Sequence, residues 1–243
     1  MSIPLSIRQP ERGYRFSIDS VLLAGFAAPY CRGAVLDLGT GCGILLLLLA
    51  RLSLEMSSGT GVELQEELLS CARANFRGNG LDGVLRAVGG DFRGEIPDVV
   101  PGSFDLVVSN PPYGRVGEGR RNPEPGKEAA RHEVACSLQE IFAAAGRFLA
   151  PHGRFALVLP VERLPEIGEC GRKERLSAKT FRLVHPREGK PPSRVLCCLS
   201  REGCGSAGEL PPLYLHGDRE KYCPEVERIC RLFRSGRQMH GPE

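Results

Sequence analysis

The stretch of sequence that decides the fold is an apolar segment ending in a glycine-rich turn, Val35-Leu36-Asp37-Leu38-Gly39-Thr40-Gly41-Cys42-Gly43. It is followed by an apolar run with the length of a helix, so the sequence predicts a strand, a tight turn and a helix. Glycine adopts positive φ angles at little cost and lets a ligand approach the backbone closely. The turn is therefore a candidate ligand site at the carboxyl end of a strand.

Outward from this stretch, short apolar segments alternate with longer amphipathic ones, which is typical of a parallel sheet flanked by helices. The predicted strands are Ala34–Leu38, Thr60–Glu63, Val84–Val88, Phe104–Ser109 and Phe155–Leu159. The predicted helices between them are Ile44–Leu54, Gln65–Asn75 and Leu138–Leu149. We expect an α/β fold with a doubly wound, mostly parallel, Rossmann-like sheet and helices on both faces.

The two ends of the chain continue this pattern. Ser17 or Asp19 is predicted to cap a helix through Val21–Ala28, and residues 114–126, rich in glycine, proline and arginine, are predicted to form a mobile loop. The last part is predicted to hold a helix at Val161–Cys170, a strand at Arg194–Ser200, a turn at Gly203–Gly208, a strand at Leu213–His216 and a helix at Pro224–Arg234. We expect one domain over residues 1–243, with an N-terminal segment (1–33), a core (34–200) and a C-terminal strand and helix (201–243).

Composition narrows the class of protein. The longest apolar run, Ile44 to Ala50, is far shorter than the roughly 20 residues of a membrane helix. The first residues carry several charges and no apolar core of a secretion signal, so we expect a cytoplasmic protein without membrane contact. The 10 cysteines form no Cys-x-x-Cys pair, and we expect them to be reduced and structural, with no metal site.

The net charge of +3 is too small to indicate a nucleic-acid partner by itself, but its distribution is uneven. Residues 172–194 carry eight basic side chains and only two acidic ones, Glu174 and Glu188. Such a run is either a solvated basic face or a surface for nucleic acid, and composition alone leaves both open.

The glycine-rich turn differs from the dinucleotide-binding fingerprint because Ile44 stands where a third small residue is required. Its G-x-G-x-G spacing instead resembles motif I of methyltransferases that bind S-adenosylmethionine. Glu63 ends the next strand, where a carboxylate can accept hydrogen bonds from ribose hydroxyls, although it could equally be a first-turn acid of the following helix. Asp91 and Phe92 follow the third strand; by the same resemblance they would bind the cofactor adenine, and the alternative for Asp91 is a turn residue.

The fourth strand leads directly into the tetrapeptide Asn110-Pro111-Pro112-Tyr113, at the sheet edge where such folds bind substrates. The side-chain oxygen of Asn110 and the carbonyl of Pro111 can accept both hydrogens of an aromatic amino group and direct its lone pair at a methyl donor. Two prolines hold this backbone extended, and Tyr113 offers a face for an extruded base. The alternative is a Pro-Pro turn with a rim tyrosine, and the motif fits amino-group methylation without specifying adenine.

Three further segments narrow the resemblance. Gln9-Pro10-x-x-Gly13-Tyr14-Arg15-Phe16-Ser17-Ile18-Asp19-Ser20-Val21-Leu22-Leu23-Ala24, Ala130-Arg131-His132-Glu133 and His185-Pro186-Arg187-x-Gly189-Lys190-Pro191 are similar to the bacterial family that methylates N6 of adenine 37 in valine tRNA. In that family the opening segment covers the cofactor. Gly114 departs from it, since many relatives have a second aromatic residue there, and His132 is predicted to lie in a loop or helix start.

The resemblance implies S-adenosylmethionine as the cofactor and a catalytic set of Asn110, Pro111, Pro112 and Tyr113. The implied cofactor contacts are Tyr14, Arg15, Phe16, Asp37, Gly39, Thr40, Gly41, Gly43, Glu63, Leu64, Asp91, Phe92 and Asn110. For Asp19 a part in closing the site and a helix cap remain equal alternatives. The expected contacts with nucleic acid are Arg115, Arg120, Arg121, Lys190 and Arg194.

We therefore expect methyl transfer to N6 of an adenine in structured RNA, with a tRNA as the expected substrate. One alternative is a methyltransferase of glutamine side chains in a translation release factor. Those enzymes carry a helical substrate domain before the core, whereas only about 34 residues precede the glycine-rich strand here. The other alternative is a catalytically silent subunit that binds RNA, although such proteins usually lose the glycine turn or the tetrapeptide, and both are intact.

Overall fold

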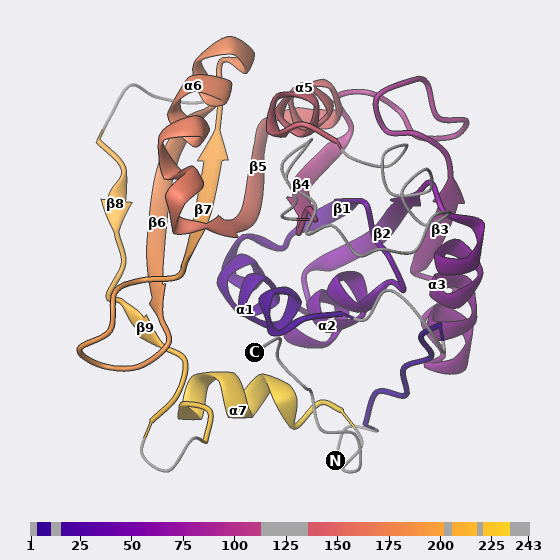
Figure 1. Cartoon of the computed structure of the whole chain (residues 1–243). Helices are drawn as coiled ribbons and strands as arrows, with labels where there is room; N and C mark the ends of the chain where they lie inside the picture. Colours follow the sequence, from indigo (N-terminus) through magenta and orange to yellow (C-terminus); the bar gives the residue numbers. More distant parts are fainter. Residues whose placement is uncertain (1–3, 11–15, 113–135, 202–205, 218–220, 234–243) are drawn as a thin grey trace, which may run out of the picture.

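The computed structural model describes residues 4–10, 16–112, 136–201, 206–217 and 221–233. These residues build a mixed sheet in the order β3-β2-β1-β4-β5-β7-β6-β8, with β9 also paired to β6 (Figure 1). The strands are β1 (Gly33–Leu38), β2 (Met56–Glu63), β3 (Leu85–Gly89), β4 (Phe104–Ser109), β5 (Leu149–Pro160), β6 (Ser177–His185), β7 (Arg194–Ser200), β8 (Gly208–Glu209) and β9 (Leu213–Tyr214). β1 to β5 are parallel, and β7 is antiparallel to both of its neighbours.

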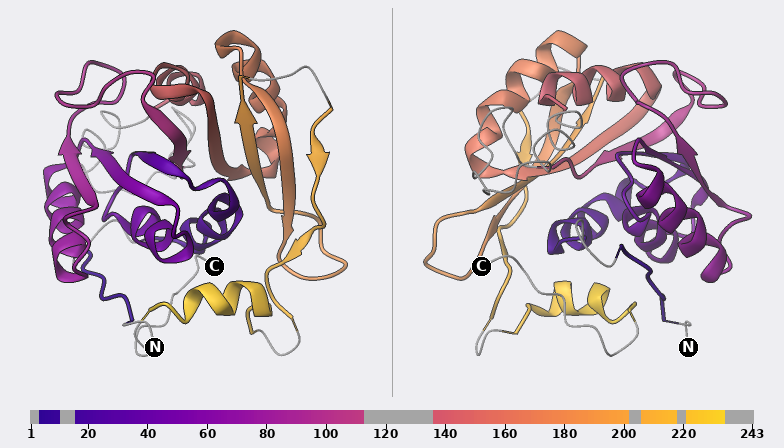
Figure 2. Two further views of the ribbon diagram at one scale, coloured as in Figure 1. Left: turned by 180° about the vertical axis from the view of Figure 1, so that it is seen from behind. Right: turned by 45° about the vertical axis from the view of Figure 1, so that its right-hand side comes forward.

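Helices cover both faces of the sheet. They are α1 (Ile18–Ala27), α2 (Ile44–Leu52), α3 (Glu66–Gly78), α5 (Leu138–Phe148), α6 (Leu164–Glu174) and α7 (Pro224–Cys230), with short 3-10 turns η1 (Ala28–Tyr30) and η2 (Val161–Arg163). α1, α2, α3 and α7 pack on one face, and α5 and α6 pack on the other (Figures 1 and 2). Along β5, Ala156 and Val158 enter the first cluster, while Phe155 and Leu157 enter the second, as the period of two in a strand requires.

Local sequence explains where two of the helices begin. The side chain of Ser17 accepts a hydrogen bond from the Asp19 amide at 3.3 Å and caps α1, so the cap is Ser17 and not Asp19. At α5, Ser137 and Glu140 form a reciprocal capping box. α2 needs no polar face, because Ile44 through Leu49 are all buried between the sheet and α1.

The predicted fold class is confirmed, and each predicted strand and helix of the core is present with ends shifted by a few residues. Two strands, β6 and β8, were not predicted from the sequence, and β6 lies inside the basic run. Lys179 and Arg182 interrupt its apolar alternation, and eight of its nine residues are only half-buried. Its neighbour β7 is almost fully buried and was predicted, because a continuous apolar run reads clearly as a strand.

The N-terminal segment is anchored to α3 and to the C-terminal part of the chain. The amide side chain of Asn79 bonds the backbone N–H and C=O of Ser6, and that of Asn75 bonds those of Arg8. Leu5 donates its amide to the carbonyl of Leu232 at 2.6 Å. Two distant parts of the sequence thus close the same side of the domain.

None of the helices that the structure describes has the length and apolar composition needed to cross a bilayer. The cysteines at described positions are all free thiols, most of them buried or half-buried. Burial raises the pKa of Cys197 and of Cys198 to about 12, so these two thiols stay protonated and act as small apolar side chains. Cys204 lies outside the described residues.

Candidate active site

The candidate site lies where the strand order reverses. β1 pairs with β2 on one side and with β4 on the other, so the loops after β1 and β4 leave the sheet in opposite directions at a switch point, where open α/β sheets bind their ligands. The hydroxyl of Ser109 donates to the carbonyl of Leu38 at 3.0 Å and ties the ends of β4 and β1 together. The glycine-rich turn and the Asn110 tetrapeptide therefore share one edge of the sheet.

The turn after β1 depends on its glycines. Gly39, Gly41 and Gly43 have φ angles of 75°, 58° and 80°, in the left-handed region that side chains rarely adopt. A Cβ on Gly39 would meet no atom within 4 Å, whereas one on Gly43 would lie 2.5 Å from the ring of Phe76. Gly43 is thus required for packing against α3, and Gly39 presents bare backbone to open space, as a cofactor cradle requires.

Two acids lie beneath this turn. Asp37 is buried and accepts a 2.7 Å hydrogen bond from the Thr40 hydroxyl. Burial raises the pKa of Asp37 to about 7 despite that hydrogen bond, and the nearby charge of Glu63 adds to the rise. Glu63 accepts the amide of Gly41 at 2.8 Å on one oxygen and that of Gln65 at 2.9 Å on the other.

These contacts support both interpretations of Glu63. It stabilises the start of α3 through Gln65, and it also fixes the glycine-rich turn through Gly41. A carboxylate has about four acceptor positions, so these two amides leave room for ribose hydroxyls. Leu64, the next predicted cofactor contact, is 47% exposed, so an apolar side chain lies at the surface directly after β2.

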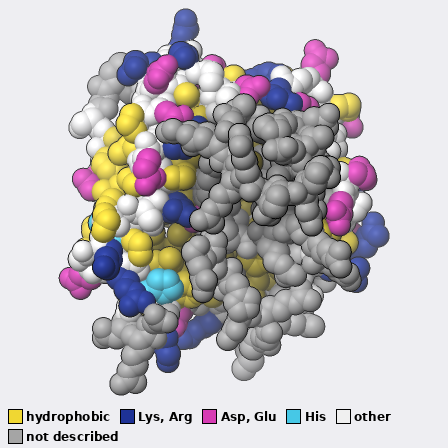
Figure 3. Space-filling model, in the orientation of Figure 1, with side chains coloured by type: hydrophobic (Ala, Val, Ile, Leu, Met, Phe, Trp, Pro, Cys, Tyr) yellow, Lys and Arg dark blue, Asp and Glu magenta, His cyan; other side chains and the backbone are white. Residues whose placement is uncertain are grey.

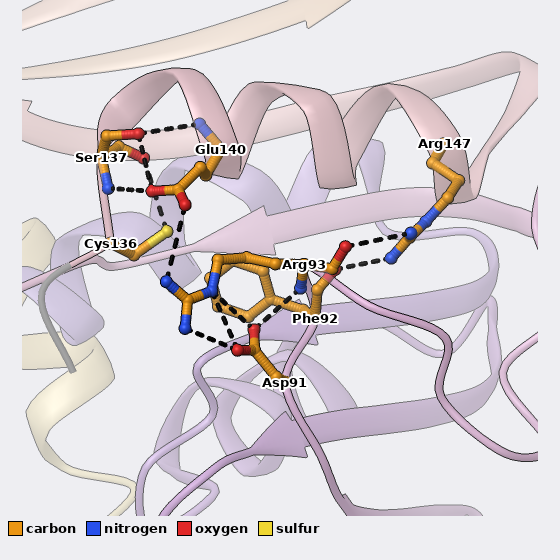
Figure 4. Close-up of polar contacts among 7 residues, drawn as sticks. All are labelled: Asp91, Phe92, Arg93, Cys136, Ser137, Glu140 and Arg147. Atoms are coloured by element: carbon orange, nitrogen blue, oxygen red, sulfur yellow. Dashed lines mark hydrogen bonds and ion pairs between the residues drawn. The ribbon is translucent and has the colours of Figure 1, made fainter. Parts of the chain in front are cut away.

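Asp91 and Phe92 follow β3 on the same edge of the sheet (Figure 4). Phe92 packs partly buried against the cluster under α5. Asp91 forms a multiple-contact ion pair with Arg93, and the hydrogen bonds from Arg93 lower the pKa of the Asp91 carboxyl. Arg93 was not predicted as a site residue. Its position two residues after Asp91 in a turn is the sequence feature that could have indicated the ion pair.

Asn110 is positioned from the opposite face of the sheet. Its Nδ2 donates to the hydroxyl of Ser20 at 2.9 Å, and Ser20 is 2% exposed in the first turn of α1. Pro111 is buried and Pro112 is exposed. The contact fixes the amide plane of Asn110, so Ser20 belongs to the site, and no local signal in the sequence pointed to it.

The neighbouring residue Asp19 has a different partner. Its carboxylate is 3% exposed and lies 3.3 Å from the guanidinium of Arg194 at the start of β7. This ion pair links α1 to β7 beside Asn110. Arg194, which we expected to contact nucleic acid, thus has a structural partner inside the protein, and its contact with RNA stays a prediction.

Among the predicted cofactor contacts of the N-terminal segment, Phe16 lies in the described part of the chain. Its ring stacks on Phe233 with centroids 5.6 Å apart, so the C-terminal part of the chain supports the N-terminal segment. The remaining predicted residues Tyr14, Arg15, Tyr113, Arg115, Arg120, Arg121 and His132, together with the expected mobile loop, lie outside the described residues. Within the described ranges, no three His, Cys, Asp or Glu side chains converge as a metal site would require.

Comparison with known proteins agrees with this geometry. Residues 17–164 match the model of the methyltransferase small domain family. A tRNA1(Val) (adenine(37)-N6)-methyltransferase from Porphyromonas gingivalis is 32% identical over 93% of this chain and 91% of its own length. The chain belongs to that methyltransferase family. A tRNA1(Val) (adenine(37)-N6)-methyltransferase from Tolumonas auensis is 29% identical over 93% of this chain and 92% of its own.

Solved structures show the same fold at low sequence identity. The crystal structure of a predicted O-methyltransferase, protein Atu636 from Agrobacterium tumefaciens, has a TM-score of 0.68, is 19% identical and covers 87% of this chain and 94% of its own.

The family that the sequence relatives show determines the cofactor: the chain is an S-adenosylmethionine-dependent methyltransferase. The bare backbone at Gly39 and the free acceptor positions of Glu63 fit that cofactor, which supplies a methyl group on a positively charged sulfur.

In this methyltransferase the basic run of residues 172–194 divides into two groups. Arg172, Lys173 and Arg175 lie at the end of α6, while Arg187 and Lys190 lie in the turn between β6 and β7. β6 has nine residues and spans about 26 Å between them. Only the second group is at the edge of Asn110, because Arg194 pairs with Pro160 at the carboxyl end of β5. Figure 3 shows basic side chains both at the top, over the end of α6, and at the lower left, over the β6–β7 turn.

Proposed function

We propose that this methyltransferase transfers a methyl group from S-adenosylmethionine to N6 of an adenine in tRNA, with adenine 37 of valine tRNA as the target. The observation that carries the proposal is the position of Asn110 and Pro111 at the switch point of the sheet, beside the glycine-rich turn. The names of the family relatives support the substrate. The same relatives argue against the release-factor and silent-subunit alternatives.

The chemistry of an adenine amino group explains these residue types. Its lone pair is delocalised into the ring, so the nitrogen is a weak nucleophile. In the proposed mechanism, Asn110 Oδ1 and the carbonyl of Pro111 accept its two hydrogens and favour a pyramidal nitrogen aimed at the methyl group. The methylated nitrogen then loses a proton readily to water, so the mechanism needs no strong protein base.

Ser20 contributes to this step by holding the other atom of the amide. Nδ2 of Asn110 donates to the buried Ser20 hydroxyl at 2.9 Å, which holds the plane of the amide. In the proposed mechanism Oδ1 of the same amide then accepts a hydrogen of the substrate amine. The buried α1 contact thus limits the rotamers that Asn110 can sample.

For tRNA binding we propose that Arg187 and Lys190 contact phosphates near the reacting base. Both are exposed in the turn between β6 and β7, at the edge of the sheet that holds Asn110. The predicted contacts Arg115, Arg120 and Arg121 belong to the chain that follows the tetrapeptide and would act beside them. We further propose that residues 1–33 cover the cofactor, with Phe16 held by Phe233.

The test is methylation of an unmodified valine tRNA transcript by the purified protein, with mass spectrometry of the digested nucleosides. We expect N6-methyladenosine in the wild-type reaction and none with a transcript in which guanine replaces adenine 37. Asn110→Ala should abolish the product while keeping the dissociation constant of the cofactor within a few-fold, because the residue orients the acceptor. Full turnover by Asn110→Ala would refute the mechanism, and methylation of the guanine-37 transcript would refute the position.

A further inference from the structure

The turn that follows β3 is held by α5 at both ends of the helix (Figure 4). This turn contains Asp91 and Phe92 and closes with a 3.0 Å bond from the Gly94 amide to the Asp91 carbonyl. At the C-terminal end of α5, Arg147 Nη2 donates to the carbonyls of Phe92 and Gly94 at 2.6 and 2.7 Å. The backbone of the turn is therefore fixed independently of its side chains.

At the N-terminal end of α5 the contact runs through side chains. Arg93 Nη1 lies 3.5 Å from Glu140 Oε1. The other oxygen of Glu140 accepts the amide and the hydroxyl of Ser137, each at 2.7 Å, and completes the capping box. Hydrogen bonds from Ser137 lower the pKa of Glu140, so the acid is charged when it faces Arg93. The start of α5 thus positions the guanidinium.

Arg93 in turn controls the carboxylate of Asp91. Its backbone amide donates to Oδ1 at 2.9 Å, its Nε lies 2.9 Å from both oxygens, and its Nη2 donates to Oδ2 at 2.6 Å. These four contacts, two on each oxygen, come from three hydrogens, because the Nε hydrogen is shared between Oδ1 and Oδ2. One acceptor position therefore remains for a donor that displaces one branch of the shared contact, and its direction is set by the plane that Arg93 imposes on the carboxylate.

We propose that Arg93 is a positioning residue for the cofactor: it aims the remaining acceptor position of Asp91 at the amino group of the cofactor adenine and so determines the choice of an adenine base. The proposal rests on the proposed function and on the position of the cofactor adenine beside Asp91 and Phe92, which the resemblance to the methyltransferases implies. An ionised carboxylate only accepts hydrogen bonds. It attracts the 6-amino group of adenine and repels the 6-oxo group of a deaminated base.

The orientation matters because the ion pair is partly exposed. The side chains of Asp91 and Arg93 are 36% and 38% exposed, so without Arg93 water would solvate the carboxylate in several rotamers. The cofactor would then have to order Asp91 on binding. Arg93 orders Asp91 before the cofactor binds, so binding of the adenine ligand does not include this ordering cost. A ligand whose base makes no hydrogen bond with Asp91 is unaffected.

The test compares two ligands that differ only at this group, S-adenosylhomocysteine and S-inosylhomocysteine, by titration calorimetry. We expect wild type to prefer the adenine ligand by about 10- to 100-fold, as for one hydrogen bond to a charged group. In Arg93→Ala the preference should fall to about 3-fold or less, through weaker binding of the adenine ligand alone. Arg93→Lys, which keeps the charge without the fork, should recover part of the preference.

Arg182→Ala is the matched control. Arg182 makes the same kind of two-point contact with Glu225, at 2.7 and 3.0 Å, between β6 and α7. Its loss should leave the ratio of the two affinities unchanged. Thermal denaturation of each variant checks folding, and a ratio of affinities is insensitive to a fraction of unfolded protein.

Three outcomes would overturn the proposal. A wild-type ratio in Arg93→Ala would remove the role of Arg93 while leaving the cofactor site intact. Tighter binding of the adenine ligand by Arg93→Ala would show that Arg93 competes with the cofactor for Asp91. Equal affinities of wild type for the two ligands would instead refute the placement of the adenine at Asp91. Methylation of tRNA tests the proposed function separately, since it does not depend on this ratio.

Discussion

Single side chains in this site act mainly by fixing the group next to them. Thr40 fixes Asp37, the amides of Gly41 and Gln65 fix Glu63, and Ser20 fixes Asn110. Each contact holds a polar group of the site in one orientation. We therefore expect that replacing the side chain that contacts a functional residue alters catalysis, although the functional residue itself is still present.

Ser20→Ala is expected to lower kcat by about 3- to 10-fold, the worth of one hydrogen bond, while the KM for tRNA and the dissociation constant of the cofactor stay unchanged. The amide of Asn110 loses its hydrogen bond with Ser20 and samples more rotamers. Steady-state kinetics on the tRNA transcript measures this, and Ser20→Thr, which retains a hydroxyl, should recover activity.

Ser17→Ala is the control for Ser20, since it removes the helix cap in the same turn of α1. It should lower the free energy of unfolding by about 1 kcal/mol and leave kcat unchanged. An unchanged kcat in Ser20→Ala, or an equal loss in both variants, would exclude a specific role for the Ser20 hydroxyl.

The raised pKa of Asp37 should make the free energy of unfolding depend on pH. This pKa is raised from 3.8 to about 7, so the folded protein keeps a proton that the unfolded chain has lost between those values. The free energy of unfolding of wild type should therefore fall across this window as the pH rises, by about 1.4 kcal/mol per pKa unit. Asp91 and Glu140, whose pKa values are lowered from 3.8 and 4.5, act in the opposite sense, at and below the acidic end of the window.

The Asp37→Asn variant isolates this group, because it keeps an acceptor for Thr40 and cannot ionise. Relative to wild type it should gain stability from pH 4 to pH 8, by up to about 4 kcal/mol, in denaturant unfolding without cofactor. The difference between the two proteins at pH 4 serves as the reference. A difference that does not change with pH would show that Asp37 titrates normally.

At the scale of secondary structure, the elements are joined by side-chain contacts with backbone as much as by apolar packing. α3 holds the N-terminal segment by Asn75 and Asn79, and α5 holds the turn after β3 by Arg147. Asn75 also donates to the carbonyl of Cys42 at 2.8 Å, so it connects the N-terminal segment to the glycine-rich turn.

Asn75→Ala should therefore be more damaging than Asn79→Ala. Asn75 is 1% exposed and its loss leaves buried backbone groups without partners, whereas the Asn79 contacts with Ser6 are exposed to water. We expect losses in the free energy of unfolding of about 2–3 kcal/mol and about 1 kcal/mol, respectively. Denaturant unfolding measures both, and losses of equal size would contradict the ranking by burial.

At the scale of the whole molecule, the sheet carries its basic residues to two opposite ends. Arg187 and Lys190 lie at the edge of Asn110, and Arg172 and Lys173 lie at the far end of β6. In the proposed binding mode, a tRNA with its target base at Asn110 would approach the first pair directly. The second pair would then affect binding only through the weaker long-range field, which salt screens.

We expect Arg187→Gln with Lys190→Gln to weaken tRNA binding and to reduce the slope of log affinity against log salt by about 1.5, as for two lost phosphate contacts. The double variant Arg172→Gln with Lys173→Gln is matched in charge and should keep a slope near that of wild type. Filter binding between low and moderate salt measures both. Equal effects of the two pairs would place the RNA over both ends of the sheet.

The sequence by itself determined most of the strands, the helices, the glycine-rich turn and the tetrapeptide at the sheet edge, because apolar periodicity, glycine and proline act over a few neighbouring residues. The nature of the cofactor and the family followed from motifs of the same local kind. β6 was not predicted because this half-buried strand is interrupted by basic side chains. The basic run was therefore interpreted as one continuous surface.

Only the tertiary structure decided which residues hold the site together. Ser20 and Asn110 are 90 positions apart, Asp19 and Arg194 are 175 apart, and β7 enters the sheet between β5 and β6. Such contacts depend on how distant elements pack. A single hydroxyl or guanidinium produces no periodic pattern in the sequence from which its partner could be predicted. The division of the basic run has the same cause, since a strand of nine residues separates in space what is continuous in sequence.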